Sequence, residues 1–136
     1  MHSRLWKRAA AVTHFEIYAE APAKLAEFYR SLFGWQIEQA PGIDYWRIQT
    51  GATDSEAIRG GLLYRPFPGP RSWVHYVNVA SLDEAVAEVQ RLGGTLLRPK
   101  TAVPKTAWYA VVADPEGNIF AVWQADANAM PAPLPD

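Results

Sequence analysis

An internal repeat constrains the fold of this 136-residue chain more than any other feature of its sequence. The stretch from His14 to Ile37 has the same layout as the stretch from Val74 to Leu97. In each, alternating apolar residues come first, apolar residues at helical spacing follow, and a glycine comes after them. Gly34 and Gly94 lie 60 positions apart, and the same offset relates both ends of the two stretches without a gap. A unit that cannot bury its apolar face alone is stabilised by its copy. The sequence therefore predicts two similar modules in one compact domain.

The first module is expected over residues 12–65 as a strand, a helix and three further strands. Apolar and polar residues alternate from Val12 to Ala19, which is typical of a half-solvated strand. Pro22 suits a first helical position, and Gly34 is expected to end the helix. The later strands are expected at residues 35–39, 44–50 and 57–65. Two glycines in the last of them indicate a bulge or the close approach of a ligand.

The second module is expected over residues 72–125, after a linker at residues 66–71 that is rich in proline and glycine. Ser81 and Glu84 form a capping-box pattern at the start of its helix. Its strands are expected at residues 73–79, 95–97, 107–113 and 118–124, with a turn at Asp114 to Gly117 before the last. Residues 1–11 are interpreted as a loose basic arm. The proline- and alanine-rich tail, 126–136, is expected to have no structure of its own.

Charge and composition exclude several classes of function. With 13 basic and 14 acidic residues the net charge is −1, so the chain has no basic stripe of the kind that binds nucleic acid. The absence of cysteine excludes disulfides, thiolate metal sites and thiol nucleophiles. It is also compatible with a reducing compartment, and we expect a cytoplasmic protein. No stretch has the apolar length of a membrane span or of a secretory signal, so we expect no membrane partner.

This order of elements resembles the glyoxalase, bleomycin-resistance and extradiol dioxygenase superfamily, also called the vicinal oxygen chelate family. The resemblance is carried by HFEIYAEAPAKLAEFYRSLFGW in the first half and by WVHYVNVASLDEAVAEVQRLGG and DPEGNIFAVWQ in the second. It covers roughly residues 12–125. Within the superfamily, the sequence is most similar to a group of small bacterial proteins described as predicted enzymes related to lactoylglutathione lyase. The resemblance implies an α+β fold of two tandem βαβββ modules, whose strands form a cupped mixed sheet with the helices outside. It also implies a homodimer.

Alternation along the strands assigns their residues to two faces, because successive side chains point to opposite sides of a sheet. One set is apolar and is expected to pack beneath the helices. The other set is polar, aromatic or small, as a ligand-binding cup requires. The first set is Phe15, Ile17, Leu62, Val77, Val79, Phe120 and Val122. The second set is His14, Glu16, Tyr18, Arg59, Gly61, Leu63, Val74, Tyr76, Asn78, Ile119, Ala121 and Trp123.

The resemblance implies a divalent metal held by up to four residues inside the cup. Of these four positions, only His14 is filled by a residue that binds metals. Its counterpart in the second copy is Val74, and the two positions on the closing strands are Gly61 and Ala121. A divalent ion in an open site needs about three His, Asp or Glu ligands. We therefore predict an incomplete metal site.

His14 and Glu16 are the candidate catalytic residues, and they lie on the same face about 7 Å apart along one strand. They are compatible with a hydrogen-bonded polar pair that has Arg59 as its counter-ion, or with a weak metal site. A third interpretation is acid–base chemistry, in which Glu16 removes a proton next to a carbonyl and His14 donates to the developing oxygen. His75 is one residue out of step with the lost metal position and is expected to face the helix.

We therefore expect a protein that binds a small organic molecule in the cup between the modules. The expected ligand-binding residues are Tyr18, Arg59, Tyr76, Asn78 and Trp123, whose aromatic rings favour a flat or apolar ligand and whose arginine suits a carboxylate. One alternative is a metal-dependent lyase, isomerase or dioxygenase that uses His14 and Glu16. Another is a protein that sequesters a drug, although a net charge of −1 gives no acidic groove for a cationic one.

Overall fold

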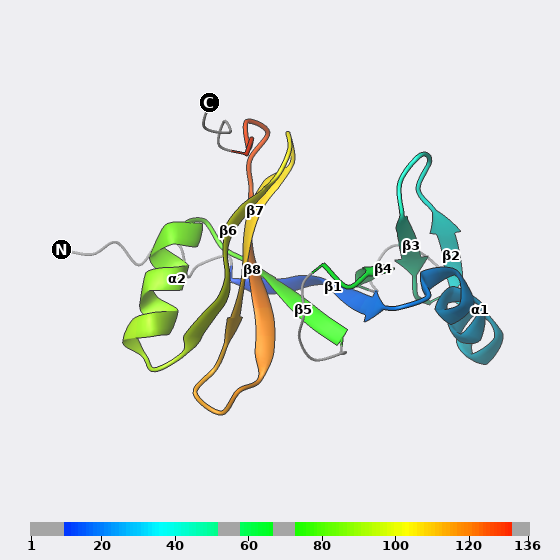
Figure 1. Cartoon of the computed structure of the whole chain (residues 1–136), viewed down its shortest axis with the longest axis horizontal. Coiled ribbons are helices and arrows are strands. Elements are labelled where there is room, and N and C mark those ends of the chain that lie inside the picture. The colour runs from blue at the N-terminus through cyan, green and yellow to red at the C-terminus, as the bar shows by residue number, and fades with distance from the viewer. Residues whose placement is uncertain (1–9, 52–57, 67–72, 132–136) are drawn as a thin grey trace. The chain divides into compact units, whose positions relative to one another are not determined.

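The computed structural model describes residues 10–51, 58–66 and 73–131, which form two helices and eight strands (Figure 1). The expected α+β class is confirmed, since each helix follows a first strand and precedes three more. The chain divides into two compact units. The first unit comprises residues 13–75, and the second comprises residues 76–136 together with residues 1–12.

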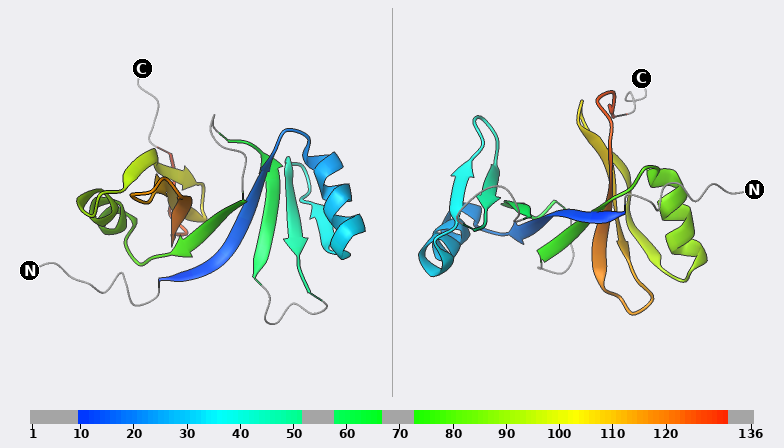
Figure 2. Two further views of the ribbon diagram at one scale, coloured as in Figure 1. Left: turned by 90° about the horizontal axis from the view of Figure 1, so that it is seen from below. Right: turned by 180° about the vertical axis from the view of Figure 1, so that it is seen from behind.

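The first unit contains one helix and a four-stranded arrangement in the order β2-β3-β4-β1. Strands β1 and β4 run parallel, and the other neighbours run antiparallel (Figure 2, left). The bounds are Ala11–Ala19 for β1, Pro22–Phe33 for α1, Gln36–Gln39 for β2, Tyr45–Gln49 for β3 and Arg59–Tyr64 for β4.

The second unit repeats this arrangement, with its strands in the order β5-β8-β7-β6 and with β5 and β8 parallel. The first three residues of β5 belong to the first unit, and the first two residues of β1 belong to the second. The bounds are Trp73–Asn78 for β5, Leu82–Arg91 for α2, Thr95–Val103 for β6, Ala107–Ala113 for β7 and Ile119–Ala125 for β8.

The strand register confirms the repeat of 60 residues. In the first unit Glu16 pairs with Gly61, and in the second Tyr76 pairs with Ala121. Each member of the second pair lies 60 positions after its counterpart in the first. The two parallel strand pairs are therefore equivalent residue by residue.

The signals that begin and end the helices act as expected. Pro22 occupies the first turn of α1, and Gly34 ends that helix in the left-handed conformation with φ of 71°. In α2 the Ser81 hydroxyl accepts a hydrogen bond from the Glu84 backbone N–H at 3.2 Å. The side chain of Gln124 accepts a further one from the Leu82 N–H at 2.8 Å. The end of β8 thus fixes the start of α2.

The DPEGN segment forms the expected turn between β7 and β8. One carboxylate oxygen of Asp114 accepts hydrogen bonds from the backbone N–H groups of Glu116, at 2.9 Å, and Asn118, at 3.0 Å. The other oxygen accepts one from the side-chain amide of Asn118. These bonds lower the pKa of Asp114, the Asn118 side chain being the first cause. The most specific motif of the sequence therefore builds a turn.

The apolar set that was predicted to lie beneath the helices does so in both units. In the first unit Phe15, Ile17 and Leu62 belong to a buried cluster that includes Ala26 of α1. In the second, Val79 and Val122 are buried with Leu82 and Ala85 of α2, and Val77 and Phe120 pack against them. The opposite side of each unit's strands is called its helix-free face below.

Gly60 of β4 is explained by one ring of this core. A β-carbon at residue 60 would lie 2.4 Å from the Phe15 ring, so only glycine allows the ring to lie there. The Phe15 ring stacks on Trp73 with centroids 5.2 Å apart and planes 14° apart. The sequence indicated a bulge or a close ligand at this glycine, and in the structure it is the Phe15 ring that approaches the backbone closely.

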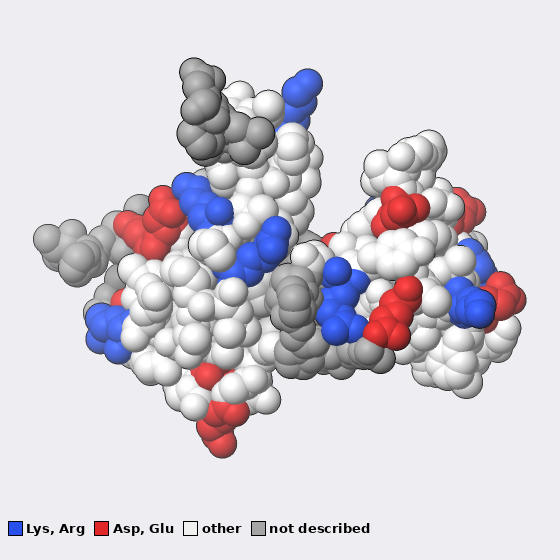
Figure 3. All heavy atoms as spheres, in the orientation of Figure 1, with Lys and Arg blue, Asp and Glu red and all other residues white. Residues whose placement is uncertain are grey.

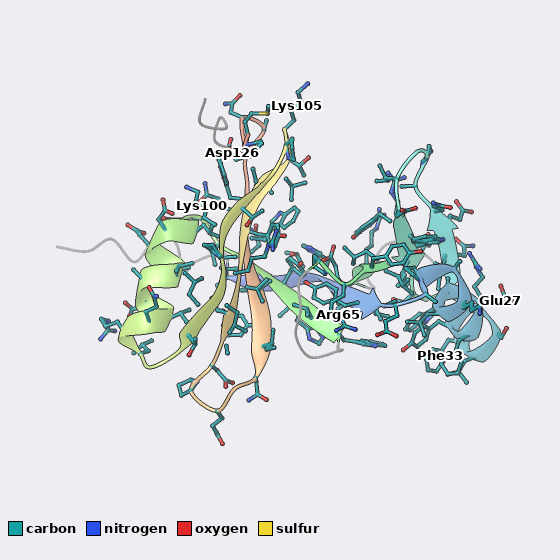
Figure 4. The ribbon with its side chains drawn as sticks, viewed as in Figure 1. Glu27, Phe33, Arg65, Lys100, Lys105 and Asp126 are labelled. Atoms are coloured by element: carbon teal, nitrogen blue, oxygen red, sulfur yellow. The ribbon has the colours of Figure 1, made fainter. Side chains whose placement is uncertain are left out.

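Three parts of the chain differ from expectation or lie outside the described residues. Strand β6 continues to Val103, because irregular pairing with β7 lets it extend beyond residue 97. The start of the tail is ordered, since the Asp126 N–H donates to the Thr106 carbonyl and the Lys105 N–H to the Ala129 carbonyl. Figure 4 labels Asp126 and Lys105. Most of the expected arm and linker lies outside the described residues.

Side chains of both charges occur on the face shown in Figure 3, where they are interspersed among uncharged ones. None of the helices in the described part of the chain is long and apolar enough to cross a membrane.

Replacing Gly60 by Ala is expected to lower the free energy of unfolding by about 1–3 kcal/mol, because the new methyl group overlaps the Phe15 ring. Urea unfolding measures the loss. The control is the double variant Phe15→Leu with Gly60→Ala. Its smaller side chain at residue 15 should relieve part of the overlap, so the double variant should lose less stability than the sum of the two single changes. Strict additivity of the two single changes would contradict this account of the glycine.

Candidate functional site

The helix-free face of the first unit brings together four of the residues that the sequence singled out. Alternation along β1 places His14, Glu16 and Tyr18 on this face, opposite the residues that pack against α1. Arg59 on β4 is the direct cross-strand neighbour of His14. Glu16 is only 9% exposed and Tyr18 is 5% exposed, so both polar groups are largely withdrawn from water.

Tyr45 of β3 is the hydrogen-bonding partner of Glu16. Its hydroxyl donates to the Glu16 carboxylate, and its ring is half-buried. Burial raises the pKa of Tyr45 well above its usual value. The negative charge of Glu16 and the hydrogen bond to it raise that pKa further, whereas the nearby charge of Arg47 lowers it. At neutral pH the Tyr45 hydroxyl therefore keeps its proton and donates a hydrogen bond to the buried carboxylate of Glu16.

Gly61 provides the space into which Tyr45 extends. A β-carbon at residue 61 would overlap the Tyr45 hydroxyl oxygen, and the rest of the phenol ring begins 2.2 Å away. Gly61 pairs with Glu16 on one side and with Arg47 on the other. Any side chain at residue 61 would have to displace Tyr45. The two glycines of β4 thus accept one ring from each side of the sheet.

His14 lies at the edge of this group. It is half-buried, and burial lowers the pKa of its imidazole below the ordinary value. The Thr13 hydroxyl lies 3.1 Å from its Nδ1 atom. A lowered pKa leaves the ring neutral at pH 7, with one nitrogen as a donor and the other as an acceptor.

The helix-free face of the second unit is aromatic. Tyr76 of β5 is 3% exposed, and its ring meets Trp123 of β8 edge to face at 5.9 Å and Tyr109 of β7 at 6.3 Å. Trp123 pairs with Asn78 on one side and with Tyr109 on the other. The predicted ligand residues Tyr76, Asn78 and Trp123 therefore lie on adjacent strands. The Tyr109 hydroxyl accepts a hydrogen bond from Arg98 Nε at 3.0 Å.

The positions at which the superfamily resemblance implies metal ligands do not fit a metal site here. Val74 is 2% exposed and Ala121 is fully buried, and neither has a donor atom in its side chain. Gly61 has no side chain, and the Tyr45 hydroxyl fills its place. Within the described ranges no three His, Cys, Asp or Glu side chains lie close enough together to hold an ion. His75 is exposed on β5.

Sequence reasoning missed Tyr45, Arg47, Arg98 and Tyr109. Tyr45 pairs with Leu63 and Tyr109 with Trp123, so the two tyrosines are equivalent although they lie 64 positions apart and not 60. The longer hairpin between β6 and β7 hides the equivalence from a search without gaps. Applying alternation to the strand at residues 44–50 would have placed Tyr45 and Arg47 opposite the apolar Trp46 and Ile48.

A comparison with protein families identifies the class of this chain. The model of the glyoxalase-like domain matches residues 14–123, which include both units and nearly all of the strands described above. The chain therefore belongs to the glyoxalase-like domain family.

Individual relatives agree with this assignment. The chain is 31% identical over 111 residues to CFP32 of Mycobacterium tuberculosis, which is named provisionally as a glyoxylase. The match covers 79% of this chain but 41% of CFP32, so the chain spans less than half the length of this relative.

Solved structures share the fold at low sequence identity. One is a superfamily member from Vibrio splendidus, at 14% identity and a TM-score of 0.57, with 82% of this chain and 96% of that chain covered. Another is a methylmalonyl-CoA epimerase variant from Streptomyces coelicolor in complex with 2-nitronate-propionyl-CoA. It is 15% identical, with a TM-score of 0.57 and coverage of 90% of this chain and 99% of that chain.

Replacing Tyr45 by Phe is expected to reduce the loss of stability at alkaline pH. The folded protein holds the Tyr45 proton more tightly than the unfolded chain, where tyrosine has a pKa of about 10. Above about pH 10, unfolding releases this proton, so the free energy of unfolding falls as the pH rises. Urea unfolding between about pH 9 and 11 should show a shallower fall in the variant.

Tyr64→Phe is the matched control, because Tyr64 is 51% exposed at the end of β4. This change should leave the alkaline slope as it is in the unchanged protein. If the slopes of the Tyr45 and Tyr64 variants are the same, the burial of the Tyr45 hydroxyl and its bond to Glu16 are not what holds the proton.

Proposed function

We propose that this glyoxalase-like protein binds a small organic molecule on the helix-free face that carries His14 and Glu16. The observation that supports the proposal is a carboxylate that is nearly buried on a sheet face with no helix over it. A buried charge is costly unless it is paired or hydrogen-bonded. Tyr45 supplies one such bond. His14 lies two residues away on the same face, and a neutral imidazole offers one donor and one acceptor nitrogen to a polar ligand.

We propose further that binding does not depend on a complete divalent-metal site. Two of the four positions implied by the resemblance are buried apolar residues, and a third is filled by the Tyr45 hydroxyl. A metal-dependent lyase, isomerase or dioxygenase would need about one more ligand beside His14 and Glu16. Such a ligand is absent from the described residues around them. Sequestration of a drug, homodimer formation and a cytoplasmic location stay predictions.

A second candidate function is proton transfer by the same pair, and the lowered pKa of His14 favours it. A neutral imidazole can donate a proton to a developing oxyanion, and a carboxylate can accept one from a carbon next to a carbonyl. In this scheme Glu16 is the base and His14 is the acid. Tyr45 is a positioning residue that holds the Glu16 carboxylate.

The first expected outcome concerns metal content. Protein purified without chelator, then soaked in zinc, manganese, iron or nickel salts and desalted, is expected to retain less than one ion per chain. Elemental analysis measures the content. One equivalent of an ion that is lost in the His14→Ala variant would overturn the metal-free proposal and favour the metal-dependent alternative.

The second expected outcome concerns ligand binding. His14→Ala and Glu16→Ala should fold and yet bind small molecules at least about tenfold more weakly, because each change removes a polar contact in a shielded site. Saturation-transfer NMR with a mixture of small aromatic acids, amides and alcohols measures binding. Glu38→Ala, on the exposed edge strand β2, is the matched control. Unfolding of both site variants would show that the pair is structural.

A further inference from the structure

Strand β6 contains an irregularity that moves one arginine to the helix-free face of the second unit. Leu96 pairs with Val112 and packs against the α2 cluster. Two residues later Arg98 should point the same way, because alternate residues share a face. The register shifts between them, however, and Arg98 pairs with Val111. Val111 lies on the opposite face, since its neighbour Ala110 belongs to the α2 cluster. A bulge of this kind re-aims a side chain.

Arg98 meets Tyr109 as a result of this change of face. Its Nε–H donates to the Tyr109 hydroxyl oxygen at 3.0 Å, and its guanidinium carbon lies 5.9 Å from the centre of the Tyr109 ring. The arginine is half-buried, so its charge is partly shielded from water. An arginine has five N–H donors in a planar fork, and one of them is directed at Tyr109.

The Tyr109 hydroxyl is left with a proton to donate. A hydroxyl group has one donor hydrogen and two acceptor positions, and Arg98 uses one of the acceptor positions. Among the residues that the structure describes, the hydroxyl has no hydrogen-bond acceptor of its own. Donation from a cation polarises the O–H bond and strengthens it as a donor. Arg98 and Tyr109 together therefore present positive charge and a polarised O–H group.

Two further aromatic rings lie next to Tyr109. Tyr109 pairs with Trp123 across β7 and β8, and both rings lie within 6.3 Å of the Tyr76 ring. Flat aromatic molecules favour offset or edge-to-face packing against such rings. Ala121, which pairs with Tyr76 on β8, has only a methyl group as its side chain.

We propose that Arg98 and Tyr109 form a recognition site for the carboxylate of an aromatic acid, whose ring packs against the half-buried Trp123. The carboxylate accepts one hydrogen bond from the Tyr109 hydroxyl and one from the Arg98 guanidinium. This inference goes beyond the proposed function, because it assigns a second site on the other unit and names the class of ligand for that site. The site lies within residues 76–123 of the second unit, so its geometry does not depend on the His14 and Glu16 face.

The test uses the full chain with two ligands of nearly equal shape, 1-naphthoate and 1-naphthamide, in titration calorimetry. Naphthoate should bind at least about tenfold more tightly than the neutral amide, because charge-assisted hydrogen bonds are the stronger kind. Arg98→Gln should remove this preference, and Tyr109→Phe should reduce it. Arg98→Lys should keep part of it, since it retains the charge without the planar fork.

Arg91→Gln is the matched control, because Arg91 is an exposed arginine of α2 that pairs with Glu88. It should leave both affinities unchanged. Thermal unfolding of each variant identifies any that fail to fold, and in that case Tyr109→Phe decides the outcome.

The possible results separate the two proposals. Tighter binding of naphthoate that disappears in Arg98→Gln supports the site. Equal binding of the acid and the amide, or a preference that survives in the Arg98 and Tyr109 variants, overturns the site and leaves the proposed function standing. If neither molecule binds at millimolar concentration, the aromatic-acid site is overturned, and the proposed function is then judged by the His14 and Glu16 variants alone.

Discussion

Two consecutive glycines in β4 allow the first unit to exist in the form described. Phe15 covers Gly60 on the helix side of the sheet, and Tyr45 covers Gly61 on the other side. Because strand residues alternate, neighbouring positions serve opposite faces, and each face gains one ring without displacing the backbone. The Phe15 ring continues the core towards Trp73, while the Tyr45 hydroxyl reaches Glu16. The core of the first unit and the hydrogen bond to Glu16 thus both depend on glycines of β4.

Gly61 stands where the resemblance implies something else. At residue 61 the resemblance implies a metal ligand, whereas here a tyrosine from the adjacent strand donates a hydrogen bond to Glu16 from that place. In the second unit the equivalent tyrosine, Tyr109, accepts a hydrogen bond from Arg98. One tyrosine is therefore a donor to an anion and the other is an acceptor from a cation. The repeat preserves the position of the ring and changes the polarity of its surroundings.

The sequence was sufficient for the fold and for only half of the candidate site. The repeat, the glycine that ends α1, the Ser81 cap and the faces of β1, β5 and β8 follow from local periodicity, and the structure confirms them. Tyr45 and Tyr109 were missed because a longer hairpin breaks the 60-residue offset. Arg98 was not predictable from alternation, since a change of register within β6 reverses its direction. The ordered start of the tail depends on two hydrogen bonds between residues 20 and 24 positions apart.

The register shift in β6 has a consequence for how such a protein can acquire a new specificity. Leu96 and Arg98 lie two residues apart and yet serve opposite sides of the sheet. In a regular strand, moving a charge from the core side to the helix-free side requires exchanging residues at more than one position. A shift of pairing achieves it without altering any amino acid. Variation in the length of this edge hairpin is therefore as capable of changing the chemistry of the surface as substitution is.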